Sequence, residues 1–428
     1  MAKVYEKVYG YFKEQIEAKR LKPGDRVMSL RETEKMLGVS RTSVETAFLQ
    51  LAADGYIYPV EKVGYFVSDT IGTITQKQTS SKGPASEKQK YKYDFQTIGE
   101  DKEVSCLELW RRYMKSALRQ EDRLLTYANS QGEEDLRTEI ANHIRKTRNI
   151  ICSYEDIVIG AGYQNLLQIL IAVIKGDKSI SFPTANFSDG ATTFKNAGYS
   201  VNFRDKESHV IYVTPAYMTK YGEVMTMKRR RELVDHALKN NHLIIEDDYQ
   251  NDFVFSSKPT PSLYAMTGGE NTVFMGSFSR VLLPSVRISF LVLAKGMRDE
   301  YEKVKKNYNQ TASVTEQIAL AQFLRDGHLN RHIKKTHRYY EGKRELLISL
   351  LKEEFKKEAE VLVGESGMEV GLRPLKEINM DRLKKCPVKV SIIKDREGRD
   401  VLLLSCSKIS LNEIGPALKL LSDVFRSK

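Results

Sequence analysis

A loop of small hydroxyl-bearing and basic residues is the stretch of this sequence best suited to binding a ligand. Residues 276–287 read G-S-F-S-R-V-L-L-P-S-V-R and supply hydroxyls at Ser277 and Ser279 and a permanent cation at Arg287. Hydroxyls and a guanidinium suit a phosphate dianion, because both donate hydrogen bonds and the guanidinium adds a fixed charge. The centre of the same loop carries a second guanidinium, that of Arg280.

Two further stretches carry groups that would complement a phosphorylated ring. In I-I-E-D-D-Y (244–249), Asp247 and Tyr249 follow a buried strand, where a carboxylate needs a cationic partner such as a pyridinium nitrogen. The turn G-A-G-Y-Q-N (160–165) leads into a helix, whose first N–H groups favour an anion. The residues of that turn that we assign to the site are Gly162, Tyr163 and Gln164. Each signal is weak alone, and a surface acidic turn would explain E-D-D-Y equally well.

These stretches fall in a pattern of short apolar runs that alternate with amphipathic helices. Such a pattern indicates an α/β domain with a largely parallel sheet. The expected strands are 157–160, 179–182, 209–214, 243–248, 272–277 and 288–293. Two long helical stretches broken near Gly327 follow, and a small α+β cap is expected from about residue 360.

The first 68 residues have a different pattern, that of a winged helix-turn-helix. Helices are expected at 5–19, 29–38 and 39–55, and two short β runs at 56–67. Ser29 with Glu32 is typical of a capping box, and Ser40 of an N-cap. The helix from Ser40 would present short polar groups and an arginine at the end that usually faces base edges.

Six residues of this segment are candidates for DNA contact: Arg31, Ser40, Arg41, Thr42, Ser43 and Lys62. Glu45 follows on the same helix, where it either faces solvent or weakens a phosphate contact. The alternative is a helix-turn-helix that packs without touching DNA. The formal net charge of +12 permits a nucleic-acid partner but does not locate one.

Composition divides the 428-residue chain into three parts. We expect a DNA-binding domain at 1–69, a flexible basic linker at 70–93, and a large domain at 94–428 with a small subdomain from about 340. No signal peptide and no membrane-spanning run of about 18 apolar residues is present. The four scattered cysteines are typical of free thiols in a reducing cytoplasm.

Residues 3–68 resemble the GntR family of bacterial regulators through K-P-G-D-R-V-M-S-L-R, L-G-V-S-R-T-S-V and K-V-G-Y-F-V. Residues 94–424 resemble fold-type I aminotransferases through Y-A-N-S-Q-G-E-E-D-L-R, G-A-G-Y-Q-N-L-L, I-I-E-D-D-Y-Q-N-D-F and the 276–287 loop. Joined in this order, the two parts resemble the MocR subfamily of GntR regulators. That resemblance implies a cytoplasmic regulator that binds double-stranded operator DNA as a homodimer, with no membrane partner.

The resemblance also implies pyridoxal phosphate as the ligand of the large domain. Phe187 would stack on its ring, Asp247 would face the ring nitrogen, and Tyr249 the phenolic oxygen. The implied phosphate ligands are Ser277, Ser279 and Arg287. Tyr127 would reach the site of a partner subunit in a head-to-tail dimer.

The sequence departs from the family at the residue that carries the chemistry. The family loop reads G-T-F-S-K, and its lysine forms a Schiff base with the cofactor, whereas this chain has Arg280. A guanidinium stays protonated and supplies no neutral amine, so we expect neither covalent attachment nor transamination. The neighbouring family pattern has also changed, at Tyr217, Met218 and Lys220.

We therefore expect a transcription regulator, not an enzyme, whose large domain dimerises and senses a small-molecule effector. Arg280 would either pair with Asp247 or Glu246, or bind a phosphate or carboxylate of that effector. Non-covalent pyridoxal phosphate or pyridoxamine phosphate is a third possibility. The alternatives are a pyridoxal-phosphate enzyme, a covalent sensor that uses a different lysine such as Lys220, and a large domain that only dimerises.

Overall fold

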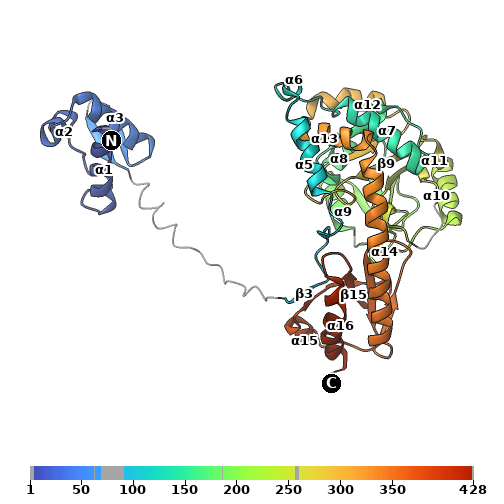
Figure 1. The fold of residues 1–428 in the computed structure, drawn as a ribbon. Helices are drawn as coiled ribbons and strands as arrows, with labels where there is room; N and C mark the ends of the chain where they lie inside the picture. Colours follow the sequence, from blue (N-terminus) through green and yellow to red (C-terminus); the bar gives the residue numbers. More distant parts are fainter. Residues whose placement is uncertain (1–3, 62, 69–90, 186, 256–259, 427–428) are drawn as a thin grey trace. The chain divides into compact units, whose positions relative to one another are not determined.

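The computed structural model describes residues 4–61, 63–68, 91–185, 187–255 and 260–426 (Figure 1). The chain forms two compact units, Met1–Gln89 and Lys90–Lys428. The expected linker at 70–93 lies outside the described residues except for its last three, and Lys62 of the expected wing also lies outside them.

The first unit has the order of elements expected for a winged helix-turn-helix. It consists of α1 (Val4–Glu17), α2 (Leu30–Leu37), α3 (Arg41–Ala53) and the antiparallel hairpin of β1 (Ile57–Val60) and β2 (Gly64–Val67). Ser29 and Glu32 form the predicted capping box, and Gly38 ends α2 at φ +61°, a left-handed conformation that glycine adopts without strain. Phe12 and Phe48 meet edge to face at 5.1 Å in the core.

The second unit is built on a seven-stranded sheet of order β4-β10-β9-β8-β7-β5-β6. The strands are β4 (Ile157–Gly160), β5 (Ser179–Phe182), β6 (Ser200–Phe203), β7 (Val210–Val213), β8 (Leu243–Asp247), β9 (Thr272–Ser277) and β10 (Ser289–Val292). Only β10 runs antiparallel to its neighbours, so the expectation of a largely parallel sheet is confirmed. The sequence analysis missed β6, a polar edge strand with no fully buried residue.

Helices cover both faces of this sheet. Its helices are α5 (Leu107–Ala117), α6 (Glu121–Leu124), α7 (Glu134–Arg148), α8 (Tyr163–Val173), α9 (Ser188–Asn196), α10 (Met227–Asn240), α11 (Leu263–Thr267), α12 (Arg298–Val304) and α13 (Val314–Arg325). Along β7, Tyr212 packs with the α8 side, whereas Ile211 and Val213 pack with α10. Because successive side chains of a strand point to opposite faces, this alternation decides which side chains reach each face of the sheet.

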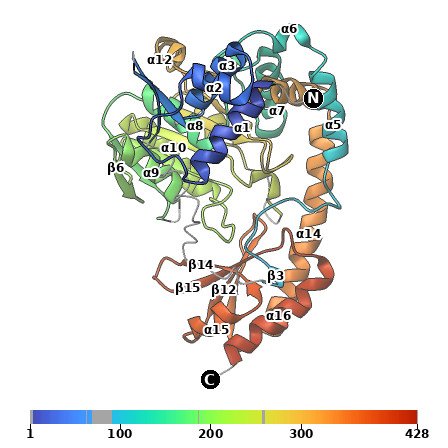
Figure 2. The same ribbon diagram turned by 90° about the vertical axis from the view of Figure 1, so that its left-hand side faces the viewer.

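The long helix α14 (His328–Glu354) leads into a smaller C-terminal part (Figure 1). It begins after Gly327, as the sequence indicated, and crosses residue 340 without a break. The smaller part contains β11 (Ala359–Leu362), β12 (Glu369–Pro374), α15 (Met380–Lys385), β13 (Val388–Lys389), β14 (Ser391–Lys394), β15 (Asp400–Ser405) and α16 (Leu411–Arg426). β13 pairs with β3 (Tyr93–Asp94), and α16 packs along α14 (Figure 2).

No helix in the described part of the chain is long and apolar enough to cross a membrane. All four cysteines carry free thiols in the structure.

Candidate functional site

A cavity of about 430 Å³ opens at the carboxyl ends of β7, β8 and β9, beside the N-terminus of α8. Parallel sheets usually bind ligands at this edge, because loops and helix N-termini converge there. The cavity brings together eight of the residues that the sequence predicted for the site: Tyr163, Phe187, Asp247, Tyr249, Ser277, Ser279, Arg280 and Arg287.

The alternation of side chains along β8 separates the roles of its acidic residues. Glu246 points to the α11 side, where its carboxylate accepts hydrogen bonds from the backbone N–H groups of Leu263 (2.9 Å) and Tyr264 (2.8 Å). Burial raises the pKa of Glu246 to about 7. Asp247, one residue later, therefore faces the cavity, and Glu246 serves the first turn of a helix.

Asp247 is the acidic group that is available to a ligand. Tyr212 donates its hydroxyl proton to Asp247, and the backbone N–H of Tyr249 donates to the same carboxylate at 3.1 Å. Burial raises the pKa of Asp247 to about 6, because desolvation of the charged carboxylate outweighs its hydrogen bonds and the attraction of Lys220. A bound cationic ring nitrogen would reverse that penalty. Sequence reasoning missed Tyr212, since nothing in an apolar strand marks one tyrosine as a partner.

A second pair of carboxylates forms a salt-bridged wall of the cavity. Arg148 binds Asp248 through Nε (2.7 Å) and Asp252 through Nη2 (2.8 Å). Burial raises the pKa of Asp248 to about 6. Burial also acts to raise the pKa of Asp252, but the charge and hydrogen bond of Arg148 outweigh it, so this pKa lies below its ordinary value. This arginine was not predicted, because it comes from the end of α7, far from β8 in the sequence.

The hydroxyl-rich loop is arranged for an anion at one end of the cavity. Gly162 has φ +93°, and a Cβ added there would lie 2.6 Å from Nη2 of Arg287. The positive φ favours glycine here, and any larger residue would push this guanidinium away from the N-terminus of α8. Ser277 accepts a hydrogen bond from Ser289 at 2.9 Å and keeps its own proton to donate. Ser279 instead donates to the carbonyl oxygen of Val286 at 2.7 Å and holds the loop in shape.

Arg280 lies in the wall of the cavity, but neither of its expected partners is beside it. Its Nη2 is 3.9 Å from Oε1 of Glu369 in β12, and its guanidinium lies 5.9 Å from the ring centroid of Phe253. Among the described residues, the carboxylate within ion-pair distance of Arg280 is that of Glu369, so the predicted pairing with Asp247 or Glu246 is not observed. Nε and Nη2 of Arg280 are buried and have no hydrogen-bond partner among the described residues.

The segment between β7 and α10 completes the wall. The hydroxyl of Tyr217 lies 2.6 Å from the carbonyl oxygen of Lys220 and 3.2 Å from Oε2 of Glu369. Nζ of Lys220 lies 4.9 Å from the ring centroid of Phe187, on which the resemblance would stack a cofactor. Burial lowers the pKa of Lys220.

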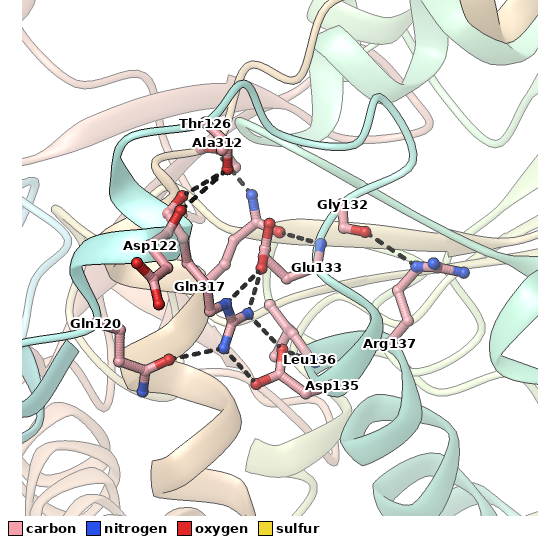
Figure 3. A network of polar contacts seen from close by, with 11 residues as sticks. Gln120, Asp122, Thr126, Gly132, Glu133, Asp135, Leu136, Arg137, Ala312 and Gln317 are labelled. Carbon is pink, nitrogen blue, oxygen red and sulfur yellow. Dashed lines mark hydrogen bonds and ion pairs between the residues drawn. The ribbon is translucent and has the colours of Figure 1, made fainter.

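Two predicted residues lie apart from the cavity. Gln164 is exposed on the first turn of α8, and Tyr127 is fully exposed, at 106% of its reference area. A salt-bridged network holds the segment around Tyr127 (Figure 3): Arg123 binds Glu133 and Asp135, and the Gln317 side chain accepts from the N–H of Glu133 at 2.8 Å. The network fixes a loop that turns its apolar side chains outward.

The exposed end of α3 carries most of the candidate DNA contacts. Ser40 caps the helix, and its hydroxyl lies 2.9 Å from that of Ser43. Arg41 forms a salt bridge from Nε to Oε1 of Glu45 at 2.9 Å. Thr42 and, on α2, Arg31 are exposed.

These features define a regulator with a helix-turn-helix unit and an aminotransferase-type unit, and comparison with known proteins supports that class. Residues 4–67 match the model described as bacterial regulatory proteins, gntR family, and residues 206–377 match aminotransferase class I and II. The HTH-type transcriptional regulator YhdI of Bacillus subtilis (strain 168) is 31% identical over 390 residues, 87% of this chain and 83% of YhdI.

More distant proteins are also similar to this chain. The probable rhizopine catabolism regulatory protein MocR of Rhizobium meliloti is 25% identical over 81% of this chain and 77% of its own. The crystal structure of an archaeal alanine:glyoxylate aminotransferase superposes with a TM-score of 0.71 at 21% identity, covering 84% of this chain and 95% of that one, which shows the fold. The chain therefore belongs to the gntR family of bacterial regulatory proteins and is a transcription regulator with an aminotransferase-like domain.

Replacing Asp247 by Asn should stabilise the protein at pH 8. The pKa of Asp247 is raised from 3.8 to about 6, so the folded state binds the proton more tightly and the charge costs stability above pH 6. We expect Asp247→Asn to raise the free energy of unfolding at pH 8 by about 1–3 kcal/mol, with the gain disappearing as the pH falls from 6 to 4.

Asp252→Asn is the matched control, because the pKa of Asp252 is lowered and its charge is salt-bridged to Arg148. This variant should be less stable than the native protein at pH 8. Urea unfolding of both variants across pH gives the answer, and a loss of stability in Asp247→Asn at pH 8 would contradict the assignment.

Proposed function

We propose that the chain is a cytoplasmic regulator that binds an operator through residues 1–69 and, through residues 94–428, dimerises and senses a small anionic effector without covalent catalysis. The observation that carries this proposal is Arg280, which stands in the cavity wall with two buried nitrogen atoms that have no hydrogen-bond partner in the described part of the chain. Buried donors are almost always satisfied in folded proteins. An effector carboxylate or phosphate would satisfy them.

The residues of the cavity fit the phosphate and the ring of pyridoxal phosphate, but not its covalent attachment. Ser277, Arg287 and the N-terminus of α8 would hold the phosphate, Phe187 would contact the ring, and Asp247 would hold a proton at the ring nitrogen. When bound, that cofactor supplies an electrophilic aldehyde. The family places its amine in this loop, and the side chain at that position here, Arg280, has no lone pair to offer.

The charges of the wall suggest how an effector would act on the protein. Arg280 joins a loop of the large sheet to Glu369 in the smaller C-terminal part. An anion bound at Arg280 would compete with Glu369 for the guanidinium, and would therefore change the contact between these two parts. An effector that binds one arrangement better shifts the population toward it, and the paired DNA-binding domains would follow.

The absorbance spectrum of the protein with pyridoxal phosphate tests the assignment of Arg280. After desalting, we expect the native protein to lose the visible band of covalently attached cofactor, and Arg280→Lys to retain it. Tyr217→Phe serves as a control variant of the same wall that adds no amine.

Retention of the band by the native protein would mean that another lysine attaches the cofactor, and Lys220 would be examined first. Loss of the band in Arg280→Lys as well would mean that the cavity no longer fits pyridoxal phosphate, and the effector would then be a different anion.

The salt bridge between Arg41 and Glu45 leads to a test of the DNA-binding surface. Because Glu45 partly neutralises Arg41, Glu45→Gln should free the guanidinium for a phosphate. We expect several-fold tighter binding to a 30-base-pair duplex of random sequence. The slope of the logarithm of affinity against the logarithm of salt concentration should become steeper by about the amount for one phosphate contact.

Glu14→Gln, an equal change of charge on the exposed face of α1, is the control for overall charge. Fluorescence anisotropy between 50 and 200 mM salt measures both variants. Equal effects of the two substitutions would show that Arg41 makes no contact with the DNA backbone.

The projecting loop around Tyr127 leads to a test of dimerisation. Leu125 and Tyr127 are 84% and 106% exposed on a loop that ion pairs hold in place, an arrangement suited to insertion into a second copy. We expect the double substitution Leu125→Ser, Tyr127→Ser to raise the dimer dissociation constant at least tenfold in sedimentation velocity, whereas Leu238→Ser on α10 should leave it unchanged. Equal dissociation constants for all three proteins would exclude the loop from the interface.

A further inference from the structure

A second hollow, of about 510 Å³, lies where the parallel strands β5, β6 and β7 end, on the side of the sheet that α10 covers. We call it the α10 pocket. Among the described residues, Tyr212 is the only one that lines both this pocket and the larger cavity. The α10 pocket is therefore a separate space, on the other face of the sheet but at the same carboxyl edge of its strands.

The floor of the α10 pocket is apolar. Ile211 and Val213 of β7 face it because they alternate with Tyr212, and Leu233 of α10 lies opposite them. Met218 and Met225, from the segment between β7 and α10, complete the floor. Methionine side chains adapt to the shape of what they contact, so this floor suits an aromatic or branched aliphatic body.

The rim of the α10 pocket is basic. Four cations and two carboxylates lie along the pocket: Arg204, Lys206, Arg229, Arg396, Asp205 and Glu232. The carboxylate of Asp205 is occupied within its own turn, since it accepts hydrogen bonds from Ser208 Oγ (2.7 Å), Asn202 Nδ2 (3.3 Å) and the N–H of Glu207 (3.1 Å). These bonds lower the pKa of Asp205, and its charged carboxylate forms no ion pair with the arginines of the rim among the described residues.

Two arginines of the rim have donors to spare. Arg204 adopts φ +54°, a conformation that L-residues rarely take. Its backbone N–H donates to the carbonyl oxygen of Phe182 at 2.9 Å, and its Nε donates to the carbonyl oxygen of Pro183 at 3.1 Å. These two hydrogen bonds hold the guanidinium at the mouth of the pocket. Arg229 is exposed on the first turn of α10, and neither arginine has an ion-pair partner in the described part of the chain.

We propose that the α10 pocket binds a small organic carboxylate with an aromatic or branched aliphatic body. The carboxylate lies against Arg204 and Arg229, whose guanidinium groups match its two oxygens, and the body lies on Ile211, Val213 and Leu233. A purely apolar ligand would leave the basic rim unused, and a small inorganic anion would leave the floor exposed to water.

The two sites share a wall segment. Between β7 and α10, Thr214 and Lys220 line the larger cavity, whereas Met218 and Met225 line the α10 pocket. A ligand that repacks these methionines therefore acts on the segment that also contacts an effector in the larger cavity. The α10 pocket would thus give the regulator a second input, coupled to the larger cavity through this shared segment.

Titration calorimetry of the full-length protein with 2-naphthoate tests the proposal, with 2-naphthamide as the uncharged probe of the same shape. We expect one naphthoate site per chain and at least fivefold weaker binding of the amide. Arg204→Ala and Arg229→Ala should each weaken naphthoate binding at least fivefold. Arg231→Ala, a matched change on an exposed residue of α10 outside the pocket wall, should not.

Filling the pocket separates it from the larger cavity. Leu233→Trp should abolish naphthoate binding, and Arg287→Ala, which alters only the larger cavity, should leave it unchanged. If Arg287→Ala abolishes naphthoate binding and Leu233→Trp leaves it unchanged, naphthoate binds in the larger cavity and the proposal is overturned. Equal affinities for naphthoate and naphthamide, or no binding to the native protein, would also overturn it. If Leu233→Trp fails to fold, the exposed substitutions Arg204→Ala and Arg229→Ala decide the question.

Discussion

The burial of three consecutive carboxylates at the end of β8 is the constraint on which the site depends. Burial raises the pKa values of Glu246, Asp247 and Asp248 together, so each charge must find its own compensation. Glu246 obtains it from the N–H groups of α11, and Asp248 from Arg148. Asp247 has hydrogen bonds from Tyr212 and one N–H and the more distant charge of Lys220, but no ion pair among the described residues, and is therefore the group that gains most from a cationic ligand.

A second constraint links the large sheet to the smaller C-terminal part. Arg280 and Glu369 face each other across the cavity wall at 3.9 Å, which is within Coulombic range but too long for a hydrogen bond. Both side chains keep buried atoms that have no hydrogen-bond partner among the residues that the structure describes. A pair left incomplete in this way is suited to respond to a ligand, because an anion or a donor can enter between the two charges and lower the free energy of both.

Much of the fold could be predicted from the sequence. Three of the six expected strands, β4, β5 and β9, have the observed bounds. The caps at Ser29 and Ser40 were also predictable, since an N-cap depends on residues within one turn. The strand β6 was not, because it is only four residues long and its two apolar side chains, Val201 and Phe203, are not fully buried at the edge of the sheet.

The sequence by itself determined the class of protein, because the order of motifs is a property of the chain alone. It also determined that the loop carries a guanidinium, that of Arg280, where the resemblance leads us to expect an amine. Tertiary structure alone decided the partners: Tyr212 for Asp247, Arg148 for Asp248 and Glu369 for Arg280. These contacts join strands and helices that are distant in sequence. Their distances depend on how the sheet, α7 and the C-terminal part pack, and local patterns carry no record of that packing.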